Sequence, residues 1–422
     1  MFDSRWTIPV ALSLLDRGDT NLDEYGALIE QDRGYGVQCV APHGAIELAG
    51  TCLDGHYYNV FPVAVPLVAA PLVFTLRKVA PLLAPVLSKV PGGGPVRAAF
   101  LAGDFLNSRP LVEVVIASFF VALTTVLMFF IGRIFLPDPY SAFLALIFAF
   151  ATSAWSTASR ALWQHGPSML MLSVALYLLI RAEGAPWLIP YAAIPVALAY
   201  LLRPTNSLFA VLVTIYVARR YRRQLLPYLL LAVPIGAAFL IYNESIYRKP
   251  LPPYFSMRPP LPALPVFEAL AGSLVSPSRG LFVYTPLFFF SILGMIEARR
   301  ARWLTPLSGY LIAVIVCNWL LMGIYFRFWW GGHSYGPRLL SDLAPLLVFF
   351  LIPPLVEWRQ AGRPLKPALL FAAMLAVSGF IHSRGATRLD VFDWNTTPDN
   401  VDRHTARLWD WRDPQFLRGL RR

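Results

Sequence analysis

Carboxylates in the first 59 residues are the most promising chemical groups in this sequence. The segment holds nine acidic residues and three arginines, a net charge of −6. A carboxylate beside a membrane surface can act as a general base on a hydroxyl or can bind a divalent cation. The alternative for each is a solvated surface acid. The candidates are Asp3, Asp16, Asp19, Asp23 and Glu24.

Arginines form a second group, at the ends of apolar runs. The planar guanidinium group matches the oxygen atoms of a phosphate, so several arginines around one cavity would suit a phosphate or pyrophosphate headgroup. The alternative is an arginine that extends to the membrane surface without a ligand. Asp342 follows the last of these arginines by four residues. It either pairs with that arginine along a helix or, as an acid inside a predicted span, has a functional role. The arginines are Arg160, Arg203, Arg279, Arg327 and Arg338.

Aromatic residues accompany two of these arginines. The segment YFRFWWGGHSYGPRLL, residues 325–340, combines aromatic residues with a Gly-Gly pair, His333 and Arg338. SRALWQHGP, residues 159–167, is similar. An aromatic belt at the membrane surface explains the tryptophans but not the Gly, His and Arg together. Aromatic faces beside polar groups also suit sugar rings. No metal-binding spacing, P-loop or GxSxG motif occurs.

Composition indicates which class of protein must position these residues. The 422 residues are 57% hydrophobic and only 14% charged, with a mean hydropathy of +0.55. A soluble domain carries about 25% charged residues. A soluble enzyme, a nucleic-acid-binding domain and a disordered chain are therefore disfavoured, and an all-α polytopic membrane protein is predicted.

Ten apolar runs predict membrane spans. Two earlier segments, 61–74 and 81–90, are short and rich in proline, so they predict re-entrant or interfacial pieces. We therefore expect an N-terminal region over 1–109, a transmembrane domain over 110–382 with a long loop at 243–280, and a C-terminal tail over 383–422. The predicted spans are 110–131, 139–155, 166–180, 186–202, 206–218, 225–242, 281–296, 304–324, 339–356 and 367–381.

Loop charges predict the orientation. Short loops rich in arginine, such as 219–223 and 299–302, should face the cytoplasm, which accounts for the net charge of +12 without a nucleic-acid partner. The tail from His382 then faces outside. Ten spans place both termini on one side, and an acidic N-terminal segment outside would need a preceding helix. We therefore expect a further transmembrane helix before Met1; the alternative is that the number of spans differs by one from ten. Cys39 and Cys52 share the N-terminal segment and are either disulfide-bonded or free.

At this point the residues resemble those of the integral-membrane GT-C glycosyltransferases, the group that includes bacterial aminoarabinose, galacturonosyl and protein-mannosyl transferases. FDSRW at residues 2–6 is similar to the segment in which a catalytic acid follows the first helix, and GHYYNVFPVAVPLVAAPLV at 55–73 is similar to an aromatic-basic-proline motif. Asn59 stands where many relatives have lysine. Other similar segments are LLRPTN at 201–206, SPSRGLFVYTP at 276–286 and WWGGHSYGPRLL at 329–340.

The resemblance implies a fold of about 10 to 11 transmembrane helices with amphipathic juxtamembrane helices in an N-terminal outer loop. It implies inverting transfer of a sugar from a polyprenyl-phosphate donor to a lipid, glycan or protein acceptor, on the outer face of a bacterial inner membrane. Mg²⁺ or Mn²⁺ is a possible cofactor. Asp3 is the expected base. The expected substrate-binding residues are Tyr58, Asn59, Arg160, His165, Arg203, Arg279, His333, Tyr335 and Arg338, with Arg279 and Arg338 on the phosphate.

Three other functions fit the same features. A transporter or flippase for a lipid-linked saccharide would share the arginines and aromatics, but it predicts inverted repeats that the sequence does not show. An O-antigen ligase or polymerase would place its main outer loop late in the chain, where 243–280 is a candidate. A non-catalytic subunit of a membrane assembly would not need the N-terminal acids.

Overall fold

The computed structural model is dominated by helices that match the predicted spans. It describes residues 3–31, 35–47, 52, 54–87, 94–255, 265–304, 306–326, 328–362 and 365–420. A helix occupies most of every predicted span. These helices are α5 (Arg109–Arg133), α6 (Asp138–Phe150), α7 (His165–Arg181), α8 (Ile189–Leu202), α9 (Ser207–Arg220), α10 (Arg222–Tyr247), α12 (Leu281–Tyr284) with α13 (Phe288–Arg300), α14 (Leu307–Leu321), α15 (Ala344–Phe349) with α16 (Ile352–Gln360), and α17 (Leu365–Thr387).

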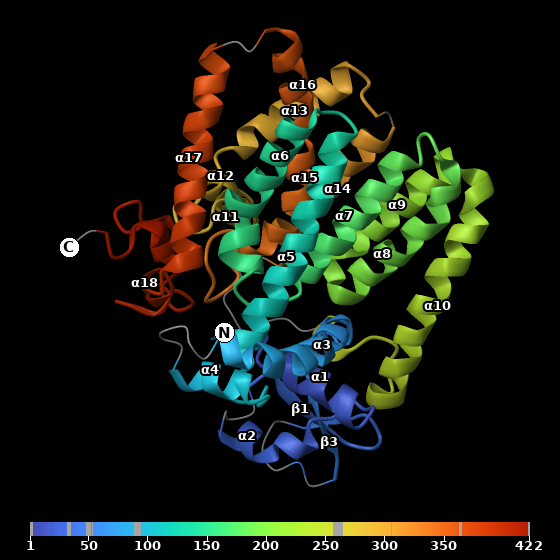
Figure 1. Ribbon diagram of the computed structural model, residues 1–422, viewed down its shortest axis with the longest axis vertical. Helices are drawn as coiled ribbons and strands as arrows, with labels where there is room; N and C mark the ends of the chain where they lie inside the picture. Colours follow the sequence, from blue (N-terminus) through green and yellow to red (C-terminus); the bar gives the residue numbers. More distant parts are fainter. Residues whose placement is uncertain are drawn as a thin grey trace.

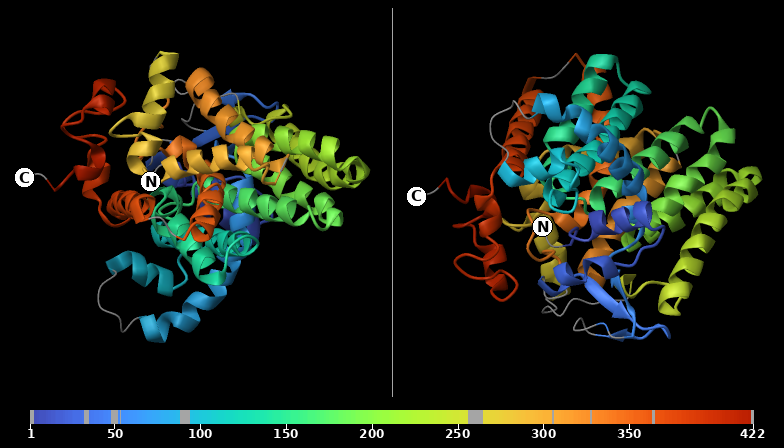
Figure 2. Two further views of the ribbon diagram at one scale, coloured as in Figure 1. Left: turned by 90° about the horizontal axis from the view of Figure 1, so that it is seen from above. Right: turned by 60° about the horizontal axis from the view of Figure 1, so that its bottom comes forward.

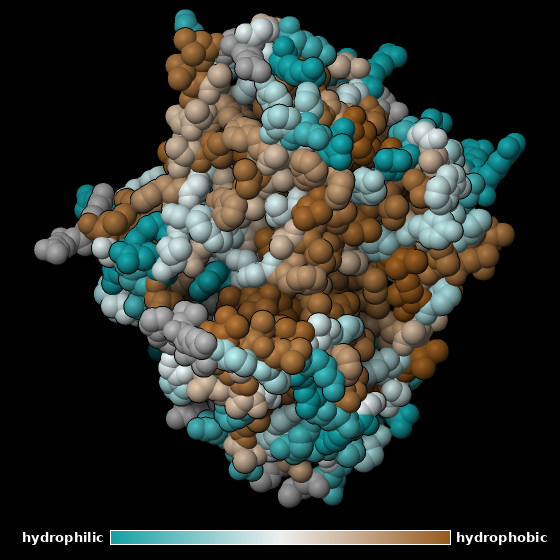
Figure 3. Space-filling view, viewed as in Figure 1, coloured by the Kyte–Doolittle hydropathy of each residue, from teal (hydrophilic) through white to brown (hydrophobic). Residues whose placement is uncertain are grey.

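Exposed apolar side chains show why this is a polytopic membrane protein. Leu230, Val233 and Ile241 on α10 are each more than 60% exposed, an arrangement that suits lipid and not water. Figure 3 shows apolar residues across the middle of one face, between polar residues at the upper and lower ends. Within the described residues, six segments are long and apolar enough to cross a membrane.

The bundle packs helices that follow one another closely in sequence. Helix α5 packs against α6 and α7, and α8 packs against α7 and α10. The segment Arg338–Gln360 lies mostly inside the bundle, where α15 occupies the centre of Figure 1. This burial matters for function because the segment begins at Arg338 and contains Asp342, two of the charged residues singled out from the sequence.

The N-terminal elements gather at the lower end of the bundle (Figure 1). They comprise α1 (Thr7–Asp16), α2 (Gly26–Gln31), α3 (Ala64–Leu87), α4 (Gly94–Leu101) and a small sheet of β1 (Val37–Val40), β2 (Ile46–Glu47) and β3 (His56–Asn59). Helix α1 packs on α3. Figures 1 and 2 show α3 running crosswise to the long helices of the bundle.

The prediction of two separate short segments at 61–74 and 81–90 was wrong. Helix α3 is one continuous helix of 24 residues that contains Pro71, Pro81 and Pro85. Each proline removes one backbone hydrogen bond, but an apolar environment still favours the helical backbone over an exposed one. Its length and composition would allow it to span a membrane, whereas its crosswise direction fits a helix along the surface.

The sheet was not predicted from the sequence. Its strands run in the order β2-β1-β3, with both pairs antiparallel and Cys39 opposite Tyr57. Trp6 and Val10, at the start of the chain, pack with Val37 and Tyr57 in one small core. Cys39 forms a disulfide with Cys52, and their Cα atoms lie 5.5 Å apart. The disulfide and this core attach the sheet to the segment that carries Asp3.

Thiol titration tests the disulfide. The unfolded wild-type protein should show one reactive thiol, that of Cys317, before reduction and three after it, because Cys317 is the free cysteine. Replacing Cys39 and Cys52 by serine should cost the N-terminal elements about 3 kcal/mol, given the 13-residue separation. Faster proteolysis of those elements would report this loss. Three reactive thiols without reductant would contradict the pairing.

The C-terminal residues return to the bundle and pack on aromatic side chains. Trp394, Val401 and Leu408 form a buried cluster with Trp329 and Trp330. Figure 1 places α18 (Asp390–Asp393) and this tail beside the lower end of α17. The tail therefore completes the packing around residues 328–338, which lead directly to Arg338.

Candidate active site

Asp3 lies in the turn that leads into α1 and forms an ion pair with Arg338. The hydroxyl of Tyr35 donates a second hydrogen bond to Asp3, at 3.0 Å from Oδ1. Tyr35 is itself held because the indole nitrogen of Trp6 donates to its backbone oxygen at 2.7 Å. The acid is thus fixed by groups from three segments of the chain.

These partners keep Asp3 ionised. Burial by itself would raise the pKa of Asp3, but the charge and hydrogen bond of Arg338, with the hydrogen bond from Tyr35, outweigh burial and lower that pKa below its usual value. The side chain of Asp3 remains 25% exposed. An ionised, partly accessible carboxylate is in the correct protonation state to accept a proton from a hydroxyl.

Arg338 begins a 3₁₀ turn, Arg338–Leu343, after the glycine-rich loop. Gly336 has a positive φ of 61° and lies so close to the Tyr284 ring that a Cβ atom would come within 2.6 Å of it. The guanidinium group of Arg338 lies over the Trp163 ring, 4.1 Å from its centroid, and its Nε donates to His165 Nε2 at 3.4 Å. The loop and the ring together orient this arginine.

A buried cluster of charged groups lies directly behind Arg338. Arg203 NH1 donates to Asp342 Oδ2 at 2.5 Å, and His165 Nδ1 lies 2.9 Å from Asp342 Oδ1. All three side chains are at most 7% exposed. The predicted pairing of Arg338 with Asp342 was therefore wrong, because Asp342 pairs with Arg203 and Arg338 pairs with Asp3.

His165 joins the two ion pairs. Its Nε2 lies 3.4 Å from Arg338 Nε, and its Nδ1 lies 2.9 Å from Asp342 Oδ1 and 2.5 Å from Arg203 NH1. Because an arginine can only donate, at least one ring nitrogen accepts, so the imidazole is neutral. The neutral ring then connects the buried Arg203–Asp342 pair with the accessible Arg338–Asp3 pair. Four charged groups and one neutral imidazole form a continuous network.

An open pocket of about 480 Å³ gives access to this network. It combines two arginines and one acid with apolar walls, and no described residue accepts a hydrogen bond from the buried indole N–H of Trp163. Guanidinium groups beside a free N–H donor suit an anionic ligand. The lining residues are Asp3, Thr7, Phe61, Pro62, Val65, Leu162, Trp163, Gln164, His165, Arg203, Tyr254, Arg338 and Leu339.

A second pocket, of about 310 Å³, shares Phe61 with the first. Tyr58 and Asn59, which were predicted to bind substrate, line this pocket and not the charged one. They lie at the end of β3 and face residues Tyr242, Asn243 and Tyr247 of α10. Of the predicted binding residues, the charged pocket therefore brings together His165, Arg203 and Arg338 with the predicted base.

The structure does not support the prediction that Arg279 binds phosphate. Its side chain is buried and all five of its N–H groups are already used. Burial lowers the pKa of Arg279 to about 10. The acceptors are the backbone oxygens of Ser278, Trp330 and Gly332 and the side-chain oxygens of Asn395 and Gln415.

Replacing Arg279 by lysine should therefore destabilise the protein without affecting ligand binding at the charged pocket. Lysine has three donors, so at least two of the five buried acceptors lose their partner, at a cost of about 3 kcal/mol. Thermal unfolding in detergent measures this cost. Weaker ligand binding at the charged pocket in an otherwise stable variant would show instead that Arg279 contacts the ligand.

Three other predicted binding residues do not line either pocket. Tyr335 is buried, and its hydroxyl donates to the Ile381 oxygen at 2.7 Å, so the predicted contact with sugar was wrong. His333 is exposed and lies 3.2 Å from Asn400 and 3.4 Å from Asp402, in the C-terminal tail. Arg160 lies two residues before Leu162 of the charged pocket, and no described residue accepts a hydrogen bond from its buried Nε. Arg327 lies outside the described residues.

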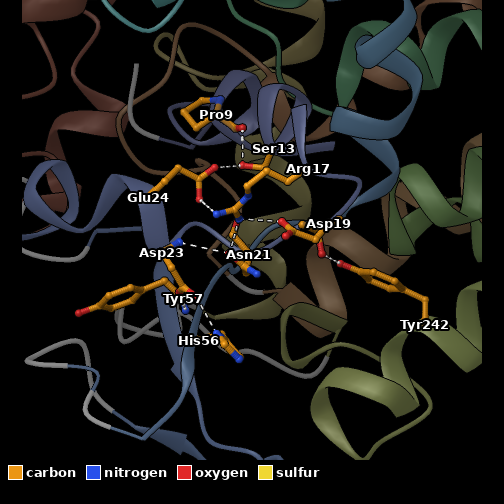
Figure 4. A network of polar contacts seen from close by, with 11 residues as sticks. Pro9, Ser13, Arg17, Asp19, Asn21, Asp23, Glu24, His56, Tyr57 and Tyr242 are labelled. Carbon is orange, nitrogen blue, oxygen red and sulfur yellow. Dashed lines mark hydrogen bonds and ion pairs between the residues drawn. The ribbon is translucent and has the colours of Figure 1, made fainter. Parts of the chain in front are cut away.

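The remaining N-terminal acids are engaged by basic groups (Figure 4). Arg17 pairs with Asp19 and Glu24, each at 2.7 Å, and Asp23 lies 2.6 Å from the His56 ring. Asp16 pairs with Arg77 of α3. In the described part of the chain, no three His, Cys, Asp or Glu side chains come together in a way that could bind a metal ion. The Mg²⁺ or Mn²⁺ cofactor stays a prediction.

Sequence reasoning missed Glu113, which supports the site from α5. Ser4, next to the catalytic candidate, donates to Glu113 Oε2 at 2.5 Å, and Glu113 is buried. The sequence does contain a sign of this role. Glu113 is an acidic residue within an apolar run, and an ionisable group inside a membrane costs free energy, so such residues are usually functional. Tyr35 was also missed, because its contact with Asp3 depends on the small N-terminal core that was not predicted.

Fold and site together define a helical polytopic membrane protein with an acid–arginine pocket at the junction of its bundle and N-terminal elements. Comparisons with protein-family models, with curated proteins and with solved structures gave no significant match to the chain. The function must therefore be inferred from the chemistry of the site.

Proposed function

We propose that this protein is a membrane glycosyltransferase that moves a sugar from a polyprenyl-phosphate donor to a lipid, glycan or protein acceptor. The observation that carries the proposal is that the ionised Asp3 and the guanidinium group of Arg338 face the same open pocket. The transfer needs a base for the acceptor hydroxyl and a cation for the departing phosphate. This pocket offers both within one ion pair.

The arrival of the donor would change the partner of Arg338. Its Nε donates to His165 and its NH2 to Asp3, which leaves further N–H groups for phosphate oxygens. As the phosphate attracts the guanidinium group, Asp3 loses part of its stabilising partner and becomes a stronger base. The pair at Asp3 would thus keep the empty site in a resting state.

The chemical step is then a displacement with inversion. Asp3 takes the proton of the acceptor hydroxyl as its oxygen attacks the anomeric carbon, forming the new C–O bond. The bond between that carbon and the phosphate oxygen breaks, and polyprenyl phosphate leaves with the electron pair. Arg338 and Arg203 stabilise the charge on the leaving phosphate. Phe61, Pro62 and Leu162 supply apolar walls that exclude water and suit a prenyl chain.

Two features support an active site on the outer face of a bacterial inner membrane. The Cys39–Cys52 disulfide belongs to the N-terminal elements, and disulfides persist in oxidising compartments such as the periplasm. The short loops at the other ends of the helices are rich in arginine, as expected for cytoplasmic loops. If this orientation holds, lipid-linked sugar would reach the pocket from the outer leaflet.

Binding of undecaprenyl phosphate to the purified full chain tests the donor assignment. Arg338→Gln should raise the Kd about 10- to 100-fold, because charge-assisted hydrogen bonds to the phosphate are lost. Arg403→Gln is the matched control, since Arg403 is exposed in the C-terminal tail and lines neither pocket. Equal Kd values for the two variants and the wild type would contradict the proposal.

Cells provide a second readout that separates a transferase from a flippase. In a deletion strain, a transferase predicts the loss of one sugar from an envelope glycan, with the donor still present on the outer leaflet. A flippase predicts that lipid-linked sugar accumulates on the inner leaflet instead. That outcome would replace the transferase proposal with the transporter alternative.

A further inference from the structure

The second pocket differs from the first in that none of its lining residues carries a charge. It lies between β3, the start of α3 and the end of α10, with Thr20 contributing from the N-terminal segment. The pocket is open to solvent, so a ligand can reach its lining residues from outside. An anionic headgroup would find no cationic partner there.

Uncharged hydrogen-bonding groups are available in this pocket. Within the described part of the chain, the hydroxyls of Tyr58 and Tyr247 make no hydrogen bond. Asn59 uses its side-chain oxygen to accept from the Phe61 N–H at 3.2 Å, which leaves its NH₂ group. Asn243 donates to the Phe239 oxygen at 2.7 Å, which leaves its own oxygen. Donors and acceptors are thus both present.

Aromatic rings supply the apolar part of the pocket. The Tyr58 and Tyr247 rings lie 6.3 Å apart at an angle of 60°, and Tyr242 is held by a 2.7 Å hydrogen bond with Thr20. Rings with a polar edge offer one face for C–H groups and one hydroxyl for a hydrogen bond. A sugar ring has the same division, with C–H groups on its faces and hydroxyls around its rim.

The Tyr58 hydroxyl stays a neutral donor. Burial raises its pKa, and the charges of Asp23 and Asp19 raise that pKa further. These two carboxylates are themselves paired with His56 and Arg17 in the network of Figure 4. The uncharged lining of the second pocket therefore suits a neutral ligand.

We infer that the second pocket binds a neutral sugar ring of the acceptor, while the charged pocket binds the phosphate of the donor. This inference rests on the proposed function. Phe61 lines both pockets, so two ligands would meet beside it, close to Asp3. The acceptor class is then a glycan or glycolipid that presents an uncharged sugar.

Saturation-transfer NMR on the purified full chain in nanodiscs tests this inference, with methyl glycosides of neutral hexoses and pentoses as probes. At least one should bind to the wild type, and methyl glucuronide should not. Tyr58→Phe with Tyr247→Phe keeps both rings but removes two hydroxyls, so the Kd should rise about tenfold. Val63→Trp fills the pocket with a bulky side chain and should abolish binding. Tyr191→Phe is the control, an exposed tyrosine on α8.

Measuring the binding of undecaprenyl phosphate to the same variants separates this test from the test of the proposed function. Its Kd should be unchanged in the tyrosine double variant. Binding of neutral glycosides that is equal in the double variant and the wild type, or that is lost on Arg338→Gln, would overturn the inference even if transferase activity is found. Conversely, glycoside binding with the expected mutant pattern, but no transfer from any lipid-linked donor, would leave this pocket as a sugar site and overturn the transferase.

Discussion

Replacing Asp3 by asparagine is expected to lower the rate of sugar transfer by about 10²- to 10⁴-fold, the usual contribution of a general base. Asparagine keeps the size of the side chain but cannot accept the acceptor's proton. Binding of undecaprenyl phosphate should persist or tighten, because Arg338 loses its ion-pair partner and becomes free for the phosphate. The measurement is single-turnover transfer from lipid-linked sugar extracted from producing membranes.

Asp16→Asn is the matched control for this variant. Asp16 also pairs with an arginine, but it is about half exposed and lines neither pocket. In a deletion strain, the wild type and Asp16→Asn should both restore the missing sugar of the envelope glycan, and Asp3→Asn should not. Full restoration by Asp3→Asn would exclude Asp3 as the base and redirect attention to Glu113, the buried acid behind it.

The pH dependence should carry the signature of the same group. In the empty enzyme, Arg338 lowers the pKa of Asp3, so kcat/KM should stay constant as pH falls to the ordinary range of a carboxyl group and should be lost only below it. Donor phosphate weakens this effect, so the acid limb of kcat should lie at a higher pH. Coincident acid limbs would argue against the exchange of partners at Arg338.

The second large effect is expected at Asp342, in the buried cluster. Asp342→Asn removes the negative charge that compensates Arg203, and both side chains are only 7% exposed. An uncompensated buried charge costs about 3–5 kcal/mol. The melting temperature of the purified protein in detergent should therefore fall sharply, and expression in membranes should fall with it.

A double-mutant cycle separates the ion pair from simple loss of packing. Arg203→Gln combined with Asp342→Asn removes both charges, so the double variant should be more stable than either single variant. Stability losses that simply add would show that the two charges do not depend on each other. Donor affinity of the double variant should still fall, because Arg203 also lines the charged pocket.

Much of the fold could be predicted from the sequence, because apolar runs of spanning length report directly on helices in a membrane protein. Each of the ten predicted spans contains a helix or a pair of short helices. The N-terminal sheet was not predictable in this way. Its strands have two to four residues, and they are held by the Trp6 core and by a disulfide between distant residues.

The site could be predicted only in part. Asp3, His165, Arg203 and Arg338 were identified from residue type and position, but their pairing was not, because Asp3 and Arg338 are 335 residues apart. The expected pair of Arg338 and Asp342 assumed an α-helix. Residues Arg338–Leu343 instead form a 3₁₀ turn with about three residues per turn, so side chains four apart do not share a face.

Arg279 is a residue that the sequence suggests for ligand binding but that has a structural role. From the sequence it looks like an arginine at the edge of a span, which is equally suitable for a ligand and for structure. Its role depends on backbone oxygens of the 330–332 loop and on two side chains of the C-terminal tail. No local pattern reports such contacts, because the chain brings them together only through tertiary folding.

The partners of Arg279 also set an order of events during biosynthesis. Asn395 and Gln415 follow it by 116 and 136 residues, so most of the membrane domain must leave the ribosome before its hydrogen bonds can form. Until then, a guanidinium group destined for complete burial has to remain hydrated. A chain that ends prematurely before Gln415 would retain every predicted span, yet it would leave one buried N–H group of Arg279 without its acceptor.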